Sequence, residues 1–588
     1  MKLFGGFRPV ALCVVILFTT QFFVRDFSDP YQRPIAGDAQ AYYAYLPAIF
    51  IYGDLDYNFI PQINSTYYPQ HYEKSFLLDV DGEKVNKTFP GAAVLYAPFF
   101  FVAHGIALIC GLPADGYSEV YQICFVIGQW FWLIAGLFFL HKVLLSFEFS
   151  RRTVLLAGVL LLFGTNLFFY SFYDVSVTHG MNFFLVNVFL FLLIRFKNGG
   201  RVSALAWAIF VLALIGITRP TNIMVVLLLP VFFPGREFYT ACWIALRKPA
   251  NFLGLTAAAL VVFFIPMLLW KLQSDQWIVY GYGDEGFIFS DPHFREFLFS
   301  YLKGWFTWTP LALLIISVGL FVLFHLNKRQ GFFVVIFYAV SIYVFSSWWC
   351  WYYGAGMSQR VMIDHYVLLA FLFCVAWQWI ERFVKGRLIF LTLVLALSGL
   401  NLVQAWQIRY GILPMGSVTA EQYWDNFLRF KKQAKIYPRE NWKHLKKTEI
   451  DLDSAGSQNI SAHVRWVEGS WITDISPSDA YSGVVSTTFN DPVRKGSKMV
   501  ISFDVRPAEA DNPESRLVYH YDTLSTEAKT YHFGQFLEKN KWTRIEVLDE
   551  VVSGAFHSLS LFFWNGGTEE RIEFRNIRVE HYFSEGYM

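Results

Sequence analysis

Over its first 410 residues the chain alternates long apolar runs with short polar breaks. The apolar runs fall at 8–25, 119–146, 153–172, 178–196, 202–218, 220–234, 251–271, 305–325, 332–349, 361–381 and 387–406. Each is close to the roughly 20 residues that a helix needs to cross a bilayer, although 220–234 is short. The pattern predicts a multi-span α-helical membrane domain over residues 1–410, with about eleven crossings.

One further apolar run, 91–112, decides the topology. Cytoplasmic loops are rich in Lys and Arg, and basic residues cluster at Arg151/Arg152, Arg195/Lys197/Arg201, Arg236/Arg247/Lys248, Lys328/Arg329 and Arg382/Lys385/Arg387. All these clusters face the cytoplasm, together with the N-terminus, only if 91–112 does not cross. Its Pro98 and the flanking Pro90 and Pro113 suit a segment that lies along the outer face or dips into it. We therefore expect a long external loop over 26–118 and an external C-terminus.

The composition agrees with a membrane location. Hydrophobic residues make up 55% of the 588 residues and charged residues 16%, against about 25% charged in soluble domains. The N-terminus carries Lys2 and Arg8 before its apolar run, but "TTQFFVRDF" offers no small-residue cleavage site, so we expect an uncleaved first span. The formal net charge of +2 gives no indication of a nucleic-acid partner, and we expect none.

The character of the chain changes after residue 410. Residues 411–450 contain the basic amphipathic stretch "AEQYWDNFLRFKKQAK", which is typical of a helix lying on a membrane surface. From 451 to 588, short alternating segments such as "KMVISFDVRP" and "WTRIEVLDEV" are separated by Gly, Asn, Asp and Pro. This spacing predicts an antiparallel β-sandwich on the outer side.

Three polar sites are expected to share the outer face of the membrane. The first is Asp38 in "RPIAGDAQAYYAYLPAIF"; the second is "FYDVSVTHGMN" with Asp174 and His179; the third is "SSWWCWYYGAGMSQRVMIDHY" with Arg360. Ionisable groups are costly in a membrane, about 2.5–3.5 kcal/mol at its centre on insertion scales. They therefore tend to mark function or paired structure.

These residues resemble a known family. A first external loop that opens with an acid followed by tyrosines ("GDAQAYYAYLPA"), a Pro-bearing apolar segment ("TFPGAAVLYAPFF") and a second acid, Asp174, resemble the GT-C superfamily of membrane glycosyltransferases. The late "WWCWYYGAGMSQR" is similar to a Trp/Gly/Arg motif of many bacterial members. The bacterial relatives of dolichyl-phosphate-mannose protein mannosyltransferases are the nearest match, over roughly residues 8–406.

The resemblance implies an inverting glycosyltransferase in the bacterial inner membrane. It would move a sugar from a polyprenyl-phosphate donor to a glycan, lipid or protein acceptor on the outer, periplasmic side, where the C-terminal domain would also lie. The catalytic carboxylate of the family falls on Asp38. Many protein mannosyltransferases have two adjacent acids at this point, whereas Ala39 follows Asp38 here.

Asp38 has two interpretations. As a catalytic base it would take the proton of the acceptor hydroxyl while that oxygen attacks the anomeric carbon, and a positioned carboxylate contributes about 10²–10⁴ in rate. Because it follows Gly37 and precedes a helix-like run, it could also cap a helix N-terminus, which is worth about 1 kcal/mol. The two roles are compatible.

The departing phosphate calls for a cation, and Arg binds phosphate oxygens in a bidentate manner. Arg360 is the first candidate, followed by Arg219 in "ITRPTN" and Lys303 in "YLKGWFTWTP". Alternatively, Arg360 pairs with Asp364 four residues on, and Arg219 and Lys303 are interfacial anchors. The remaining candidates for the substrate pocket are Tyr42, Tyr43, Trp348, Trp351 and Gln359.

Asp174 and His179 stand five residues apart at the start of a predicted span. Either they pair with each other, or together with Asp38 they hold a divalent cation such as Mg²⁺ or Mn²⁺, since carboxylate and imidazole groups both bind such ions. Some GT-C transferases use a metal and others do not. The sequence leaves the cofactor open.

Two other classes of protein are weaker alternatives. A sensor that signals through its external β-domain would explain neither the first loop nor Asp38. A transporter or flippase of a lipid-linked glycan would also have many spans, but no internal inverted repeat is visible and the polar groups gather at one surface. The closing pattern "LSLFFWNGGTEERIEFRNIRVEHY" resembles the last strands of carbohydrate-binding-module jelly rolls. The sandwich could therefore bind sugar, with Trp564 and Tyr582 as stacking residues, or it could be merely structural.

Overall fold

The structure is a computed structural model of the whole chain. It describes Val15, Thr19, Arg25, Phe27, 32–68, 76–282, 285–416 and 418–430 and, further on, 446–451, 464–467, 470–473, 482–494, 497–507, 515–521, 529–537, 539–550, 555–564 and 572–583. The chain forms two compact units, Met1–Phe430 and Lys431–Met588. The division falls within the linker predicted over 411–450.

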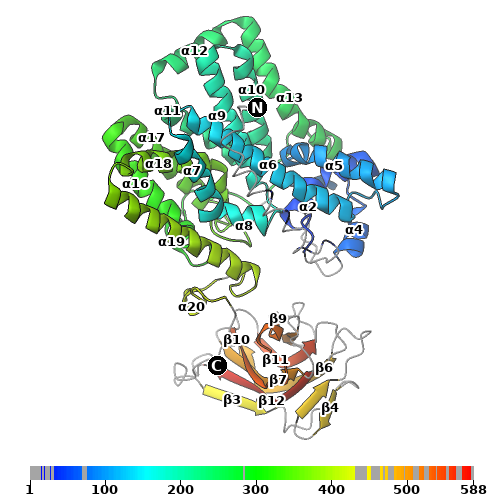
Figure 1. Cartoon of the computed structure of the whole chain (residues 1–588). Coiled ribbons are helices and arrows are strands. Elements are labelled where there is room, and N and C mark those ends of the chain that lie inside the picture. The colour runs from blue at the N-terminus through cyan, green and yellow to red at the C-terminus, as the bar shows by residue number, and fades with distance from the viewer. Residues whose placement is uncertain are drawn as a thin grey trace. The chain divides into compact units, whose positions relative to one another are not determined.

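The first unit is helical (Figure 1). Its N-terminal part is made of short elements: α2 (Asp38–Tyr43), α3 (Tyr45–Pro47), the π-helical turn η3 (Ala48–Tyr52), α4 (Ile60–Tyr67) and the hairpin β1 (Leu77–Val80) and β2 (Glu83–Asn86). The long helices follow: α5 (Gly91–Cys110), α6 (Glu119–Leu145), α7 (Arg151–Gly164), α8 (Leu167–Phe172), α9 (His179–Gly199), α10 (Val202–Thr218), η4 (Pro220–Leu228), α11 (Leu229–Phe232), α12 (Arg236–Arg247) and α13 (Pro249–Ser274).

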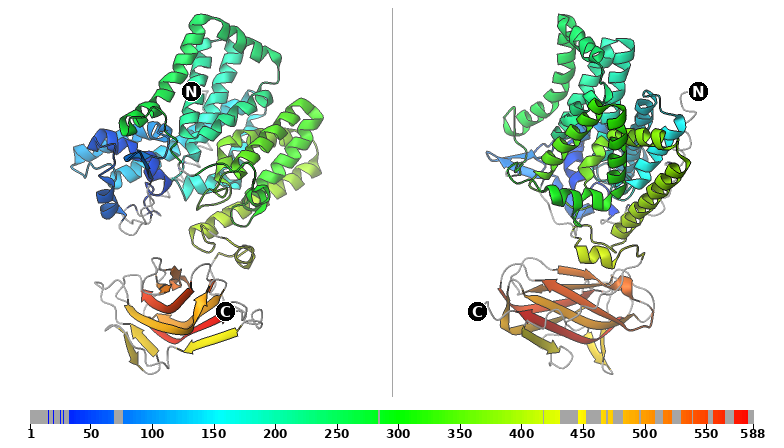
Figure 2. Two further views of the ribbon diagram at one scale, coloured as in Figure 1. Left: turned by 180° about the vertical axis from the view of Figure 1, so that it is seen from behind. Right: turned by 90° about the vertical axis from the view of Figure 1, so that its left-hand side faces the viewer.

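The second half of this unit continues the helical pattern. It contains α14 (Phe294–Phe299), α15 (Trp305–Trp308), α16 (Pro310–Leu326), α17 (Lys328–Ser346), η5 (Arg360–His365), α18 (Tyr366–Ile380), α19 (Val384–Arg409) and α20 (Ala420–Asp425). Helices α9, α10 and α13 lie side by side in both views (Figures 1 and 2). Within the described residues, each predicted span is mostly helical; the run 8–25 lies almost entirely outside them.

Seven helices in the described part of the chain are long and apolar enough to cross a membrane. They are Gly91–Cys110, Glu119–Leu145, His179–Gly199, Pro249–Ser274, Lys328–Ser346, Arg360–Ile380 and Val384–Arg409. Three shorter apolar helical stretches, Val202–Thr218, Pro220–Phe232 and Pro310–Leu326, occupy further predicted spans. The protein is therefore built for a multi-pass membrane location, and the number of about eleven crossings stays a prediction.

Two elements differ from the expected pattern. The run 153–172 is not one continuous helix: Thr165 is extended (φ −132°, ψ 171°) and separates α7 from α8, and its hydroxyl accepts a bond from the Leu167 N–H. The run 91–112 forms one continuous helix, with Pro98 inside α5. Length and composition would allow α5 to cross, so its exclusion from the membrane stays a prediction.

The basic stretch after residue 419 is not one surface helix in the residues that the structure describes. Helix α20 begins at a capping box between Thr419 and Gln422 and ends at Asp425. Tyr423 is buried and accepts a bond from Gln404 of α19 at 2.8 Å. The segment thus packs on the helical unit, and residues 431–435 lie outside the described residues.

The second unit contains two antiparallel sheets. One has the strand order β10–β7–β12–β5–β4, with β3 also paired to β12, and the other has the order β6–β11–β8–β9. The strands are β3 (Lys446–Asp451), β4 (Val464–Val467), β5 (Ser470–Thr473), β6 (Ser482–Arg494), β7 (Lys498–Pro507), β8 (Arg516–Tyr521), β9 (Lys529–His532), β10 (Thr543–Glu550), β11 (Ala555–Trp564) and β12 (Ile572–Phe583).

Side chains from both sheets share one hydrophobic core. Ile501 and Phe503 of β7 belong to the same buried cluster as Leu559 and Leu561 of β11. Their alternation along each strand is the period that the sequence shows. The predicted antiparallel sandwich is therefore present in this unit.

Candidate functional site

A cavity of about 480 Å³ lies in the helical unit and gathers segments from across its sequence. Its wall is formed by the start of α2, the β2–α5 connection, the start of η4, the loop after α13 and the loop between α17 and η5. Five of the predicted site residues line it: Asp38, Tyr42, Arg219, Trp348 and Arg360. Burial, followed by the charge of Asp38, raises the pKa of Tyr42.

Asp38 and Arg360 form an ion pair on this wall. Nη2 of Arg360 donates to Oδ2 of Asp38 at 2.6 Å, and the two side chains are 15% and 44% exposed respectively. Asp38 is the first residue of α2, and Gly37 occupies the N-cap position with φ 57° and ψ −126°. The helix-cap interpretation of Asp38 is therefore wrong.

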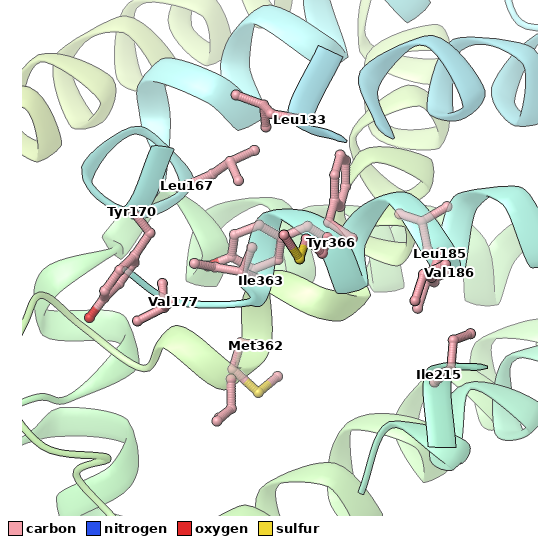
Figure 3. Close-up of a cluster of buried hydrophobic side chains, with 14 of the residues drawn as sticks. Leu133, Leu167, Tyr170, Val177, Leu185, Val186, Ile215, Met362, Ile363 and Tyr366 are labelled. Carbon is pink, nitrogen blue, oxygen red and sulfur yellow. The ribbon is translucent and has the colours of Figure 1, made fainter. Parts of the chain in front are cut away.

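Core packing holds Arg360 in place. The residues that follow it in η5, Met362 and Ile363, are buried, and Figure 3 shows them in a cluster with Leu167, Tyr170 and Val177. The η5 segment is thus fixed from the inside of the helical unit. This packing positions Arg360, the first residue of η5, at the cavity wall.

Asp364 is not the partner of Arg360, so the predicted pairing between them is wrong. Oδ1 of Asp364 bonds to Nδ1 of His179 at 2.7 Å, and Oδ2 accepts from Nδ2 of Asn222 at 2.7 Å. Nε of Arg219 lies 4.0 Å from the same Oδ2. The Asp364 and His179 side chains are both fully buried.

His179 has both ring nitrogens engaged. Nη1 of Arg219 lies 3.2 Å from its Nε2. Because a guanidinium has only donors, Nε2 must accept and the ring proton sits on Nδ1, where it is donated to Asp364. Asp174, instead of pairing with His179, accepts from the hydroxyl of Ser176 at 2.5 Å, so the predicted Asp174–His179 pair is wrong.

The set of Asp38, Asp174 and His179 does not fit a divalent cation. The imidazole is occupied on both sides, and Asp38 is paired with Arg360. Among the described residues, no three His, Cys, Asp or Glu side chains gather as metal ligands.

Four other predicted residues lie outside the cavity wall. Lys303 is buried, and its Nζ donates to the carbonyl oxygens of Gly356 and, at 2.7 Å, of Met415. Tyr43 is buried and donates to the Gly116 carbonyl at 2.8 Å. Gln359 is fully buried. The Trp351 ring packs on that of His293, with 5.8 Å between centroids.

The cavity also contains residues that the sequence did not single out. Lys87 and Glu285 form an ion pair of 3.2 Å on its wall. Tyr282 lies beside Trp348, with ring centroids 5.6 Å apart. Both residues fall in connections predicted to lie on the outer face, and this is the only feature of the sequence that could have pointed to them. No neighbouring motif distinguishes either residue.

The two predicted stacking residues of the sandwich, Tyr582 and Trp564, lie on strands β12 and β11. Tyr582 is only 4% exposed and donates to Oε1 of Glu580 at 3.3 Å, so it cannot stack on a sugar. Trp564 ends β11, opposite Arg516 of β8 in the register.

No family model and no curated protein matches the chain. Among solved structures, arabinosyltransferase EmbB from Mycobacterium smegmatis is similar over 85% of this chain and 61% of its own, at 11% identity and a TM-score of 0.32. Over 24% of its length, this chain is similar to a CBM4 structure (91% of that chain, 15% identity, TM-score 0.16). It also resembles the Stig cyclase Fisc from Fischerella sp. TAU (100% of that chain, 9% identity, TM-score 0.17). With identities and TM-scores this low, the comparisons assign the chain to no family.

Proposed function

We propose that this protein is an inverting glycosyltransferase. It moves a sugar from a polyprenyl-phosphate-linked donor to an acceptor on the outer, periplasmic side of the inner membrane. Asp38 acts as the general base, and an arginine of the cavity receives the phosphate that departs.

The observation that supports this proposal best is the composition of the cavity. The carboxylate of Asp38 and the guanidinium groups of Arg219 and Arg360 line a space of about 480 Å³, whose wall also holds the Lys87–Glu285 ion pair. Tyr282 and Trp348 supply aromatic surface beside them, and such rings offer large flat contact area with few polar demands. A space of this size is typical of a small-molecule site.

The chemistry needs little more than these groups. The acceptor hydroxyl attacks the anomeric carbon, the bond from that carbon to the phosphate oxygen breaks, and the configuration inverts. The hydroxyl proton passes to the Asp38 carboxylate, a general-base step that contributes about 10²–10⁴ in rate. The phosphate leaves with the bonding electrons, and its charge is stabilised by guanidinium groups.

The direct test is a transfer assay with Asp38→Asn. Purified protein is incubated with a panel of polyprenyl-phosphate sugars and with glycan, lipid and peptide acceptors, and release of polyprenyl phosphate is measured. Asn still accepts a bond from Arg360 but takes up no proton, so activity should fall by about 10²-fold or more. The melting temperature should change little. Asp56→Asn, an exposed acid of the same segment away from the cavity, is the matched control.

Two results would count against the proposal. Full activity of Asp38→Asn would remove Asp38 from the reaction. No release of polyprenyl phosphate with any sugar, combined with movement of the intact lipid-linked sugar across a vesicle membrane, would favour the transporter.

A further inference from the structure

The two arginines of the cavity are held in different ways. Arg360 donates directly to Asp38 at 2.6 Å. Arg219 is held from behind, with Nε 4.0 Å from Asp364 and Nη1 3.2 Å from His179. Its side chain is 18% exposed and lines the cavity. Within the described residues, Nη2 of Arg219 has no hydrogen-bond partner. Nε and Nη1 of this guanidinium therefore contact the buried side, while the Arg219 side chain also lines the cavity.

The side chains that surround Arg219 on its buried side are polar although they are almost fully buried. Asp364 and His179 are both fully buried, and Asn222 is 1% exposed. They come from η5, α9 and η4, at sequence separations of 185 and 142 residues from Asp364. Replacing a buried ion pair by apolar residues is often neutral or stabilising, so packing alone does not explain this network.

The buried network does not neutralise the positive charge of Arg219. Asp364 already accepts from His179 and from Asn222 at 2.7 Å each, whereas its distance to the guanidinium is 4.0 Å. The backbone of Arg219 is also set, because the residue before a proline is restricted to extended conformations. Arg219 has φ −150° and ψ 104°, directly before Pro220. A guanidinium that is fixed through Nε and Nη1 still has the N–H groups of Nη2, which can donate to the oxygens of a phosphate.

We infer that Arg219 binds the phosphate of the lipid-linked donor, and that Asp364, His179 and Asn222 are positioning residues that fix its guanidinium. Arg360 has a different task, which is to orient the Asp38 carboxylate. The inference rests on the proposed function. It assigns Arg360 to the catalytic base and Arg219 to the leaving phosphate. His179 acts only through Arg219, since both of its nitrogens are turned to Asp364 and Arg219.

The test uses binding of farnesyl phosphate to the purified full-length protein, measured by thermophoresis, with farnesol as the uncharged control. Arg219→Gln should weaken farnesyl phosphate binding at least tenfold and leave farnesol binding unchanged. Arg219→Lys should recover part of the loss, because the charge returns without the planar fork. Arg236→Gln, an exposed arginine at the start of α12, should bind as the wild type does.

The positioning role is tested by a double-mutant cycle. His179→Gln and Asn222→Ala should each weaken farnesyl phosphate binding several-fold in the wild-type protein. In the Arg219→Gln background they should cause no further loss, because they act through that side chain. Residues with a merely structural role would give additive losses. Melting temperatures identify any variant that has failed to fold, and the remaining variant then completes the cycle.

The outcomes separate this inference from the proposed function. Unchanged farnesyl phosphate binding in Arg219→Gln, additive losses in the cycle, or a wild-type protein that binds farnesol and farnesyl phosphate equally would each overturn the inference. A protein that behaves as expected in these binding assays, yet transfers no sugar, would keep the inference and lose the function.

Discussion

A single buried ammonium group holds the loop that leads to Arg360. Nζ of Lys303 donates to the carbonyl oxygens of Gly356 and Met415. Gly356 has φ 130°, and a Cβ there would lie 2.2 Å from the hydroxyl of Tyr170, so only glycine fits. Lys303 lies outside the spanning helices, and burial, followed by the charge of Arg360, lowers its pKa to about 7. Lys303 therefore supports the cavity without lining it.

Lys303→Met should destabilise the protein by about 1–3 kcal/mol, because two buried carbonyl groups lose their donor.

The wild-type protein should also become more stable as the pH rises from about 7 toward 10. In that window the unfolded chain still binds the Lys303 proton, which the folded chain has released. The measurement is the melting temperature against pH. If the melting temperature of Lys303→Met changes with pH as that of the wild type does, Lys303 does not titrate in this window.

The sequence singled out three ionisable residues that line the cavity, but not their partners. Asp38, Arg219 and Arg360 stand out because charges are rare in a chain this apolar. The pairs they make join residues as far as 322 positions apart, as for Asp38 and Arg360. The nearby choices, Asp174 with His179 and Arg360 with Asp364, were wrong. Helix packing brings distant groups closer than neighbours on one helix, and one sequence carries no record of that packing.

At the scale of elements, two connections close one side of the cavity. The β2–α5 connection carries Lys87, and the loop after α13 carries Glu285, which lies 3.2 Å from it. The Tyr280 hydroxyl donates to the Glu285 carbonyl at 2.7 Å, and the Trp349 N–H donates to the Gly286 carbonyl at 2.9 Å. The loop after α13 thus contacts the segment before η5 as well as the β2–α5 connection. This ion pair is the element contact that we expect to govern access to the cavity.

Charge reversal tests that contact. Lys87→Glu and Glu285→Lys should each slow polyprenyl phosphate release, because like charges then face each other on the wall. The double variant should recover, with a coupling of about 1 kcal/mol, roughly fivefold in rate. Stability should change by less than about 1 kcal/mol, since both side chains are partly exposed. Additive effects in the double variant would show that the pair does not act as a unit.

Element positions follow from hydropathy more closely than element boundaries do. The apolar runs in the described residues became helices, because a backbone in lipid must satisfy its own hydrogen bonds. The breaks were missed: α7 ends where Thr165 turns extended, and α20 stops at Asp425, far short of the amphipathic pattern. Both depend on local side-chain bonds and tertiary contacts that leave the apolar count unchanged. The strands of the sandwich were predictable, because their period of two is local.

For the whole molecule, the contacts of the cavity constrain how often the chain crosses the membrane. Asp38 and Arg219 line the same cavity, and Arg219 contacts His179. If α6 and the α7–α8 pair each cross once, as the hydropathy predicts, they place Asp38 and His179 on the same side of the membrane, and a further crossing by α5 would place them on opposite sides. The side chains of Tyr43 and Tyr45 agree, since they donate to Gly116 after α5 and to Thr88 before it.

The position of α5 can be tested with a cysteine that the chain already has. Cys110 ends α5 and is exposed, whereas Cys124 and Cys374 are buried. In a Cys350→Ser background, which removes the cysteine of the cavity wall, a membrane-impermeant maleimide should label Cys110 in intact spheroplasts. Cys110→Ser is the matched control, and Cys242 of the basic helix α12 should be labelled only after permeabilisation. A reporter fused after Gly200 should be cytoplasmic for the same reason. Labelling of Cys110 only in permeabilised cells, with an external reporter at Gly200, would mean that α5 crosses and that the basic loops face outward.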